Sequence, residues 1–192
     1  LVNPHKWLYV PFQVAAVIVR KKEHLKNTFS LVPDYLRGGL EKTEREDLMD
    51  LTLQLTKDFK ALKVWMTFKA YGAKKLRLAI ENDIAVVRYF QELVNASEDF
   101  EMLGPANLSI ATFRYVSEND GIKSNQARVD AVNERILELI EEDGRIFFAG
   151  TRINNRPALR INCNNYRRTK ADIDFLLMVL RELGEKVLLR SV

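Results

Sequence analysis

One long amphipathic segment constrains the fold of this chain more than any other feature. Between residues 73 and 97, apolar side chains recur every three or four positions, which is the period of an α-helix. The stripe consists of Leu76, Ile80, Ile84, Val87, Phe90, Leu93 and Val94. A helix with a continuous apolar face gains most of its stability when another element covers that face. We therefore expect a packed core around this helix.

The sequence after residue 97 supplies elements that can cover the helix. Strand patterns lie at 100–116 and, around a turn at Asn154-Asn155, at 145–164. Helical patterns lie at 126–144, where Gly144 is expected to end the helix, and at 169–189, where Thr169 is expected to cap it. The inward residues of the first of these helices are predicted to be Val129, Val132, Ile136 and Ile140. These elements predict a compact α+β domain over residues 73–192, with a small antiparallel sheet.

The first residues of the chain give a less complete pattern. Residues 7–12 and 13–22 read as two short strands, and the second is apolar enough for a strand buried on both faces. Residues 22–30 predict a short helix or turn. Two strands alone make a marginal sheet, so we expect this part to be the end of a larger α/β unit that spans residues 1–72.

A long loop and a helix complete that first part. Residues 31–47 carry Pro, two Gly and a run of charges, and loops of this length in compact domains are usually functional. Residues 58–72 then predict a helix that ends at Gly72. Its apolar stripe, which includes Trp65 and Phe68, is expected to be core and not a cofactor site.

Composition excludes several classes of function. The net charge is only +4 and the basic residues are spread along the chain, so nucleic acid is not an expected partner. The apolar runs are shorter than the roughly 20 residues that cross a bilayer, and no metal-ligand spacing is present. Cys163 is the only cysteine, which fits a reducing cytoplasm. The chain starts without Met inside an apparent element of structure, so we expect a piece of a longer protein.

One lysine poses a chemical question. Lys6 follows His5 within the apolar stretch "LVNPHKWLYVPF". A lysine is costly to bury unless it is paired or neutral. Lys6 therefore either extends its ammonium to water or is deprotonated for chemistry.

Four segments resemble the C-terminal part of the group II pyridoxal-phosphate-dependent amino acid decarboxylases, with the aromatic L-amino acid decarboxylases as the nearest branch. They are "NPHKWLYVPF", "FSLVPDYLRGG", "QLTKDFKALKVWMTFKAYG" and "LRINCNNYRRTKADIDFLL", and the resemblance spans essentially the whole chain. It implies an α/β fold. Residues 1–72 would be the end of the large, fold type I domain of a pyridoxal-phosphate-dependent transferase, and residues 73–192 the small α+β C-terminal domain.

The resemblance also implies site residues. Lys6 matches the lysine that bonds covalently to pyridoxal 5'-phosphate, and an apolar surrounding would favour its neutral, nucleophilic form. Asn3 and His5 match residues near the cofactor phosphate and ring, although His5 could be a merely packed histidine. Tyr35, in "VPDYL", matches a catalytic-loop tyrosine that returns a proton to Cα. Its alternative is a surface tyrosine.

Weaker matches concern the substrate pocket. Phe12 falls near the expected substrate side chain, and Gly150-Thr151 and Arg160 fall on strands that approach the site. Arg160 could bind a carboxylate or form a structural ion pair. Lys57 and Lys60 stand where relatives often have arginines, which puts loop anchoring or substrate preference in doubt.

These matches imply decarboxylation of an L-amino acid, aromatic by preference, to its amine and carbon dioxide. The family's remaining cofactor residues precede the lysine, so this part alone should be inactive. It would need the upstream part of the same enzyme and a second subunit of a homodimer. The alternatives are an aldehyde synthase or another lyase of this fold, and a non-catalytic fragment or paralogue.

Overall fold

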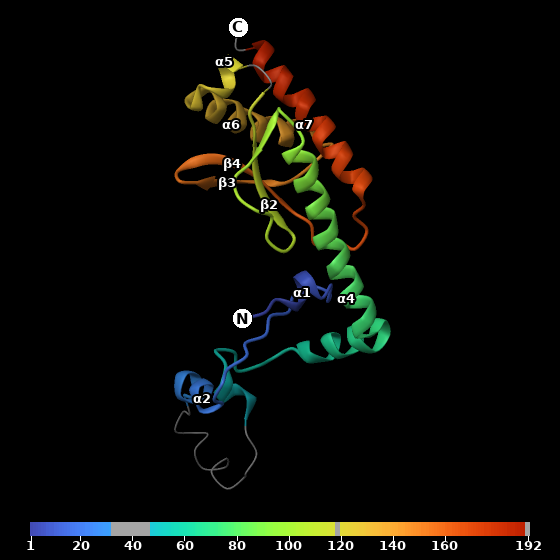
Figure 1. Ribbon diagram of the computed structural model, residues 1–192. Coiled ribbons are helices and arrows are strands. Elements are labelled where there is room, and N and C mark those ends of the chain that lie inside the picture. The colour runs from blue at the N-terminus through green and yellow to red at the C-terminus, as the bar shows by residue number, and fades with distance from the viewer. Residues whose placement is uncertain (32–46, 118–119, 191–192) are drawn as a thin grey trace. The chain divides into compact units, whose positions relative to one another are not determined.

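The computed structural model describes residues 1–31, 47–117 and 120–190 of the chain (Figure 1). The chain divides into two compact units, Leu1–Leu76 and Arg77–Val192.

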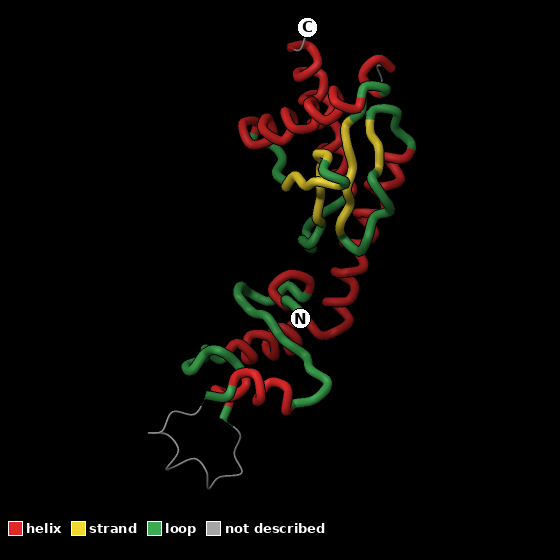
Figure 2. The backbone as a smooth tube through the Cα atoms, turned by 90° about the vertical axis from the view of Figure 1, so that its left-hand side faces the viewer, coloured by secondary structure: helices red, strands yellow, loops and turns green. Residues whose placement is uncertain are grey.

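The second unit is built on a four-stranded sheet. Its strands are β1 (Phe100–Met102), β2 (Ile110–Tyr115), β3 (Ala149–Ile153) and β4 (Arg156–Asn162), in the spatial order β1-β2-β4-β3. Every neighbouring pair is antiparallel, as predicted. Figure 2 shows the strands in yellow. The turn between β3 and β4 also matches its prediction: Asn154 and Asn155 both have positive φ, 50° and 62°, which is the backbone of a two-residue type I′ hairpin.

The predicted helices are present. They are α4 (Lys60–Asn95), α6 (Gln126–Asp143) and α7 (Lys170–Arg190), with a short α5 (Asp120–Lys123) before α6. Gly144 ends α6 with a φ of 73°, a left-handed conformation that costs glycine little. At the start of α7, the backbone N–H and the hydroxyl of Thr169 both donate to the carboxylate of Asp172, at 2.7 and 2.9 Å. These bonds lower the pKa of Asp172 and hold the first turn.

The core lies between these helices and one face of the sheet (Figures 1 and 2). It includes Val87, Phe90 and Val94 from the predicted stripe of α4, together with Val132, Ile136 and Ile140 from α6. On β4, Leu159 and Ile161 point into this core. Because side chains alternate along a strand, Arg160 and Asn162 belong to the other face of the sheet.

A side chain completes the sheet where a proline interrupts it. The β2–β4 register pairs Phe113 with Leu159, so the next matching pair would be Tyr115 and Pro157. Pro157 has no N–H to give. The buried amide of Asn133, on α6, takes its place: its Oδ1 accepts from Tyr115 N at 2.9 Å, and its Nδ2 donates to Tyr115 O at 2.7 Å. Nδ2 also donates to Val129 O at 2.8 Å.

We therefore predict that Asn133→Leu destabilises the second unit by about 2–4 kcal/mol, because it removes the two buried hydrogen bonds that the Asn133 amide makes with the backbone of Tyr115. Hydrogen exchange of the core amides in the complete protein measures this free energy. Glu141→Leu, at an exposed position of the same helix, is the matched control and should change it by less than about 0.5 kcal/mol. Equal exchange rates in the two variants would contradict the role of Asn133.

The first unit contains α1 (Pro4–Trp7), α2 (Glu23–Phe29), the 3₁₀ turn η2 (Leu48–Leu51) and the first part of α4. The prediction of α2 is confirmed, but the prediction of strands at 7–12 and 13–22 is wrong. Within the described residues of this unit, the only strand-like pairing is a bridge between Val2 and Ala16. An extended segment becomes a strand only when its backbone finds a partner. Here Val17 and Ile18 stay 61% and 80% exposed instead.

The apolar stripe at the start of α4 is a second correction. Trp65 and Phe68 were expected in the core but are exposed, as are their neighbours Phe59, Leu62 and Met66. No described residue of the first unit covers this surface. The prediction that Gly72 ends the first helix is confirmed: its backbone is non-helical, at φ 74° and ψ 156°, and a second helix follows it within α4.

Candidate active site

The helix α1 is held by a local loop of the chain. Val2 and Ala16 exchange two backbone hydrogen bonds, at 2.8 and 2.7 Å, and these bonds close residues 2–16 into a loop. Inside it, the carbonyl of Pro4 accepts from the N–H groups of both Leu8 and Val10, each at 3.2 Å. Three predicted site residues, Asn3, His5 and Lys6, therefore share a single helical turn and its cap.

His5 is half-buried within this loop. Its Nδ1 lies 3.2 Å from the backbone nitrogen of Val14 and 2.5 Å from the carbonyl oxygen of the same residue. The ring of Phe12 meets the imidazole edge to face, with centroids 4.8 Å apart and an interplanar angle of 72°. Phe12, predicted near the substrate, is otherwise 80% exposed. The structure thus brings these two predicted residues together.

The side chains of Asn3 and Lys6 form no hydrogen bond or ion pair with the rest of the described chain. Asn3 occupies the N-cap position of α1, where asparagine commonly accepts a helix N–H, yet its side chain forms no cap bond. The ammonium of Lys6 is exposed and forms no ion pair or hydrogen bond with any described residue. The apolar surrounding expected for Lys6 is therefore not formed by the described residues.

Arg160 lies on β4, in the second unit. Its cross-strand neighbours are Thr112 and Ala149, both small. Other arginines of this sheet pair with acids: Arg114 with Glu101 at 3.0 Å, Arg152 with Glu134 at 2.7 Å and Arg156 with Asp130 at 2.8 Å. Among the described residues, Arg160 has no such acidic partner. The structural ion pair considered for Arg160 is thus not formed within the described chain.

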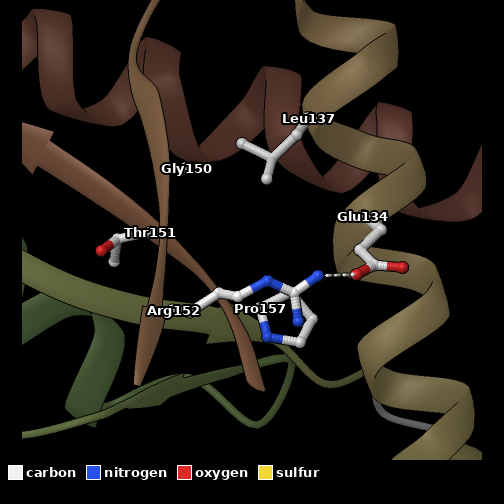
Figure 3. Close-up of a pocket in the computed structure, with 6 residues that line it drawn as sticks. All are labelled: Glu134, Leu137, Gly150, Thr151, Arg152 and Pro157. Atoms are coloured by element: carbon white, nitrogen blue, oxygen red, sulfur yellow. Dashed lines mark hydrogen bonds and ion pairs between the residues drawn. The ribbon is translucent and has the colours of Figure 1, made fainter. Parts of the chain in front are cut away.

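Gly150 and Thr151 line a pocket of about 300 Å³ between β3 and α6 (Figure 3). Leu137 and Pro157 also line it, and Arg152 meets Glu134 across it. A Cβ at Gly150 would lie 2.5 Å from Leu137 Cδ1, so glycine permits the close approach of strand and helix. The Arg152–Glu134 ion pair is exposed, and exposed ion pairs of this kind are common on protein surfaces. None of the other predicted site residues lines this pocket.

Tyr35 lies outside the described residues. Lys57 donates to the carbonyl of Leu48, and Lys60 lies 3.9 Å from Asp58, so both lysines make local contacts. Cys163 is buried, which raises the pKa of its thiol to about 11 and makes it a poor nucleophile.

Two other features are absent from the described part of the chain. No cluster of three or more His, Cys, Asp or Glu side chains there could hold a metal ion. None of its helices combines the length and apolar character required to cross a membrane.

The structure has the fold of known pyridoxal-phosphate enzymes. It superimposes on a crystal structure of Oryza sativa TDC with PLP and tryptamine with a TM-score of 0.83, at 23% identity, over 96% of this chain and 38% of that one. At this identity the similarity shows the fold alone. The predicted α/β class, with its small antiparallel sheet, is confirmed.

Sequence comparison adds the family. Residues 1–116 match the pyridoxal-dependent decarboxylase conserved domain, and the chain belongs to that family. It is 31% identical over 189 residues to an aromatic-L-amino-acid decarboxylase of Bacillus atrophaeus, covering 96% of this chain and 38% of the relative. It is 30% identical to a phenylacetaldehyde synthase of a Rosa hybrid cultivar, covering 82% and 32%. The chain thus spans less than two fifths of these relatives.

The residues of α1 fit the cofactor of this family. Pyridoxal phosphate offers an anionic phosphate and an aldehyde carbon. An asparagine amide and an imidazole can donate to phosphate oxygens, and a lysine amine can bond to the aldehyde. No acidic residue lies in the first turn of α1 to repel an anion. Lys6, His5 and Asn3 are the residues of this chain that would hold the group.

Sequence reasoning missed one contributor to this site. The contact that Val14 makes with His5 comes from its main chain, and a valine in an apolar run gives no signal of such a contact.

Proposed function

We propose that the complete protein removes carbon dioxide from an L-amino acid, aromatic by preference, with pyridoxal phosphate as cofactor and an amine as product. One observation carries the proposal. Within the part of the chain that matches the family, one helical turn and its N-cap carry Lys6, His5 and Asn3. The side chains of Lys6 and Asn3 form no hydrogen bond or ion pair with other described residues.

Each residue of α1 has a distinct task in this proposal. The amine of Lys6 is the group that would bond covalently to the aldehyde carbon of the cofactor. Asn3 and His5 hold the phosphate and so fix the distance between the aldehyde and Lys6. When bound, pyridoxal phosphate accepts the electron pair left as the carboxylate departs.

Arg160 is proposed to bind the substrate carboxylate. Its cross-strand neighbours, Thr112 and Ala149, are small, and Arg160 has no acidic partner in the described chain. A planar guanidinium can donate two parallel hydrogen bonds to a carboxylate. Phe12, exposed beside His5, is proposed to contact the substrate side chain.

Tyr35 is proposed to return the proton to Cα after carbon dioxide leaves. The support is the resemblance of "VPDYL" to the family's catalytic loop. An aldehyde synthase is the second candidate, and the phenylacetaldehyde synthase among the relatives favours it. The fate of Cα separates the two: a proton donor gives the amine, whereas reaction with oxygen gives the aldehyde.

The proposal extends to domains and partners. We propose that residues 1–72 end the cofactor-binding large domain and residues 73–192 form the small domain. The exposed stripe around Trp65 and Phe68 supports a covering surface supplied by the upstream part of the enzyme or by a second subunit of a homodimer. We also propose a cytoplasmic location, since a single buried thiol needs no oxidising compartment.

The first prediction tests the cofactor lysine. The complete protein should be yellow with pyridoxal phosphate, and borohydride should bleach it and leave the cofactor attached to the peptide that carries Lys6. Lys6→Ala should lose this attachment and reduce turnover by several orders of magnitude. Lys21→Ala, an exposed lysine of the same unit, is the control. Persistence of both colour and rate in Lys6→Ala would overturn the assignment.

The second prediction tests Arg160. Arg160→Gln should raise KM for the amino acid about tenfold to a hundredfold, because charge-assisted hydrogen bonds to the carboxylate are lost. Arg160→Lys should recover only part of this loss, since an ammonium cannot donate in the planar bidentate geometry. Arg152→Gln, which breaks the exposed ion pair between Arg152 and Glu134, should leave KM within about twofold. Similar KM values for Arg160→Gln and Arg152→Gln would count against carboxylate binding.

The third prediction tests Tyr35. Tyr35→Phe keeps the aromatic ring but removes the hydroxyl, so carbon dioxide release should continue while the product shifts from amine towards aldehyde, ammonia and peroxide. Quantifying these products in the wild type and the variant separates the two candidate functions. An unchanged amine yield would mean that another group delivers the proton.

A further inference from the structure

We propose that Asn162 is a second hydrogen-bond donor to the substrate carboxylate, beside Arg160, and that Ser109 is the positioning residue that orients its amide. The inference rests on the proposed function for the identity of the anion, which would be the carboxylate of the amino acid. The observation that carries it is the set of polar groups at one end of β4, on the sheet face opposite the core.

Asn162 belongs to the same sheet face as Arg160. The two residues are two positions apart on β4, and side chains alternate along a strand. The register pairs Asn162 with Ile110, and Arg160 with Thr112 and Ala149, so no acid lies directly across from either residue. Alternate residues of a strand are about 7 Å apart. Two N–H···O bonds of about 2.9 Å therefore allow one carboxylate to bridge the two side chains.

Ser109 determines which end of the Asn162 amide is available. The hydroxyl of Ser109 donates to Asn162 Oδ1 at 3.1 Å. Ser109 is itself held in place, because it is 1% exposed and its carbonyl accepts from the N–H of Cys163 at 2.8 Å. With Oδ1 engaged, the two N–H groups of Nδ2 remain, and they have no partner among the described residues. The exposed end of this amide is therefore a donor.

The two side chains together select the acid end of an amino acid. A guanidinium and the Nδ2 end of an amide offer donors only, and an ionised carboxylate is an acceptor only. An ammonium group would be repelled by Arg160 and would find no acceptor at Nδ2. The amine product has no carboxylate, so it loses both contacts once carbon dioxide has left. Exchange of product for substrate is thereby favoured, because only the substrate keeps these bonds.

Two matched probes test the donor role by calorimetry on the complete, cofactor-loaded protein. Hydrocinnamate carries a carboxylate but no amino group, and hydrocinnamide replaces that carboxylate by a neutral amide. Asn162→Asp keeps the shape of the side chain but replaces the donor by an anion. It should weaken hydrocinnamate binding about tenfold or more and change hydrocinnamide binding by less than about threefold. Asn154→Asp, the same change at the exposed hairpin turn, is the control and should leave both affinities within about twofold.

Ser109→Ala tests the positioning role. It should lower the ratio of hydrocinnamate to hydrocinnamide affinity about threefold, because the amide is no longer held with Nδ2 outward. A merely structural role would weaken both probes alike and leave the ratio unchanged. An unchanged ratio in Asn162→Asp or in Ser109→Ala would overturn the inference. If Arg160→Gln still raised KM and Lys6 still held the cofactor, the proposed function would stand, so the two failures are distinguishable.

Discussion

Burial of the apolar stripe of α4 against one face of the antiparallel sheet organises the second unit. Val87, Phe90 and Val94 need a partner surface, and Phe113 and Leu159 supply part of it. The same contact decides what the other face carries. Since strand side chains alternate, the register that buries Leu159 turns Arg160 away from the core. A polar face with an arginine that lacks an acidic partner in the described chain is thus a consequence of how the core is packed.

The first unit is organised by a different principle. Its candidate site depends on a short closed loop, in which backbone bonds between Val2 and Ala16 and to the Pro4 carbonyl hold α1. These backbone hydrogen bonds form between residues close in sequence and do not depend on a large core. They are therefore enough to hold α1, with His5 and Lys6, in place. The apolar surface around Trp65 remains exposed in this unit, and the family's relatives are more than twice as long as the chain. These facts support the proposal that the upstream part of the enzyme or a second subunit covers this surface.

The sequence predicted some elements well and others badly for identifiable reasons. The helices α6 and α7, the inward face of α6 and the Asn154-Asn155 turn follow from local patterns: residue periodicity, caps and positive φ. The strands at 7–12 and 13–22 were wrong because strand formation depends on a backbone partner, which no local pattern reveals. The stripe with Trp65 and Phe68 was predicted as core for the same reason: periodicity identifies an apolar face but not what covers it.

The sequence by itself determined the helical periods, the family and the residues with chemical capacity: Asn3, His5, Lys6, Tyr35 and Arg160. Only the tertiary structure decided which of these are engaged. It paired Arg114, Arg152 and Arg156 with acids but gave Arg160 no acidic partner among the described residues. It also turned Nδ1 of His5 to the main chain of Val14. The physical reason is that ion pairs and main-chain contacts depend on distances between residues that are separate in sequence, and such contacts leave no mark on residue type.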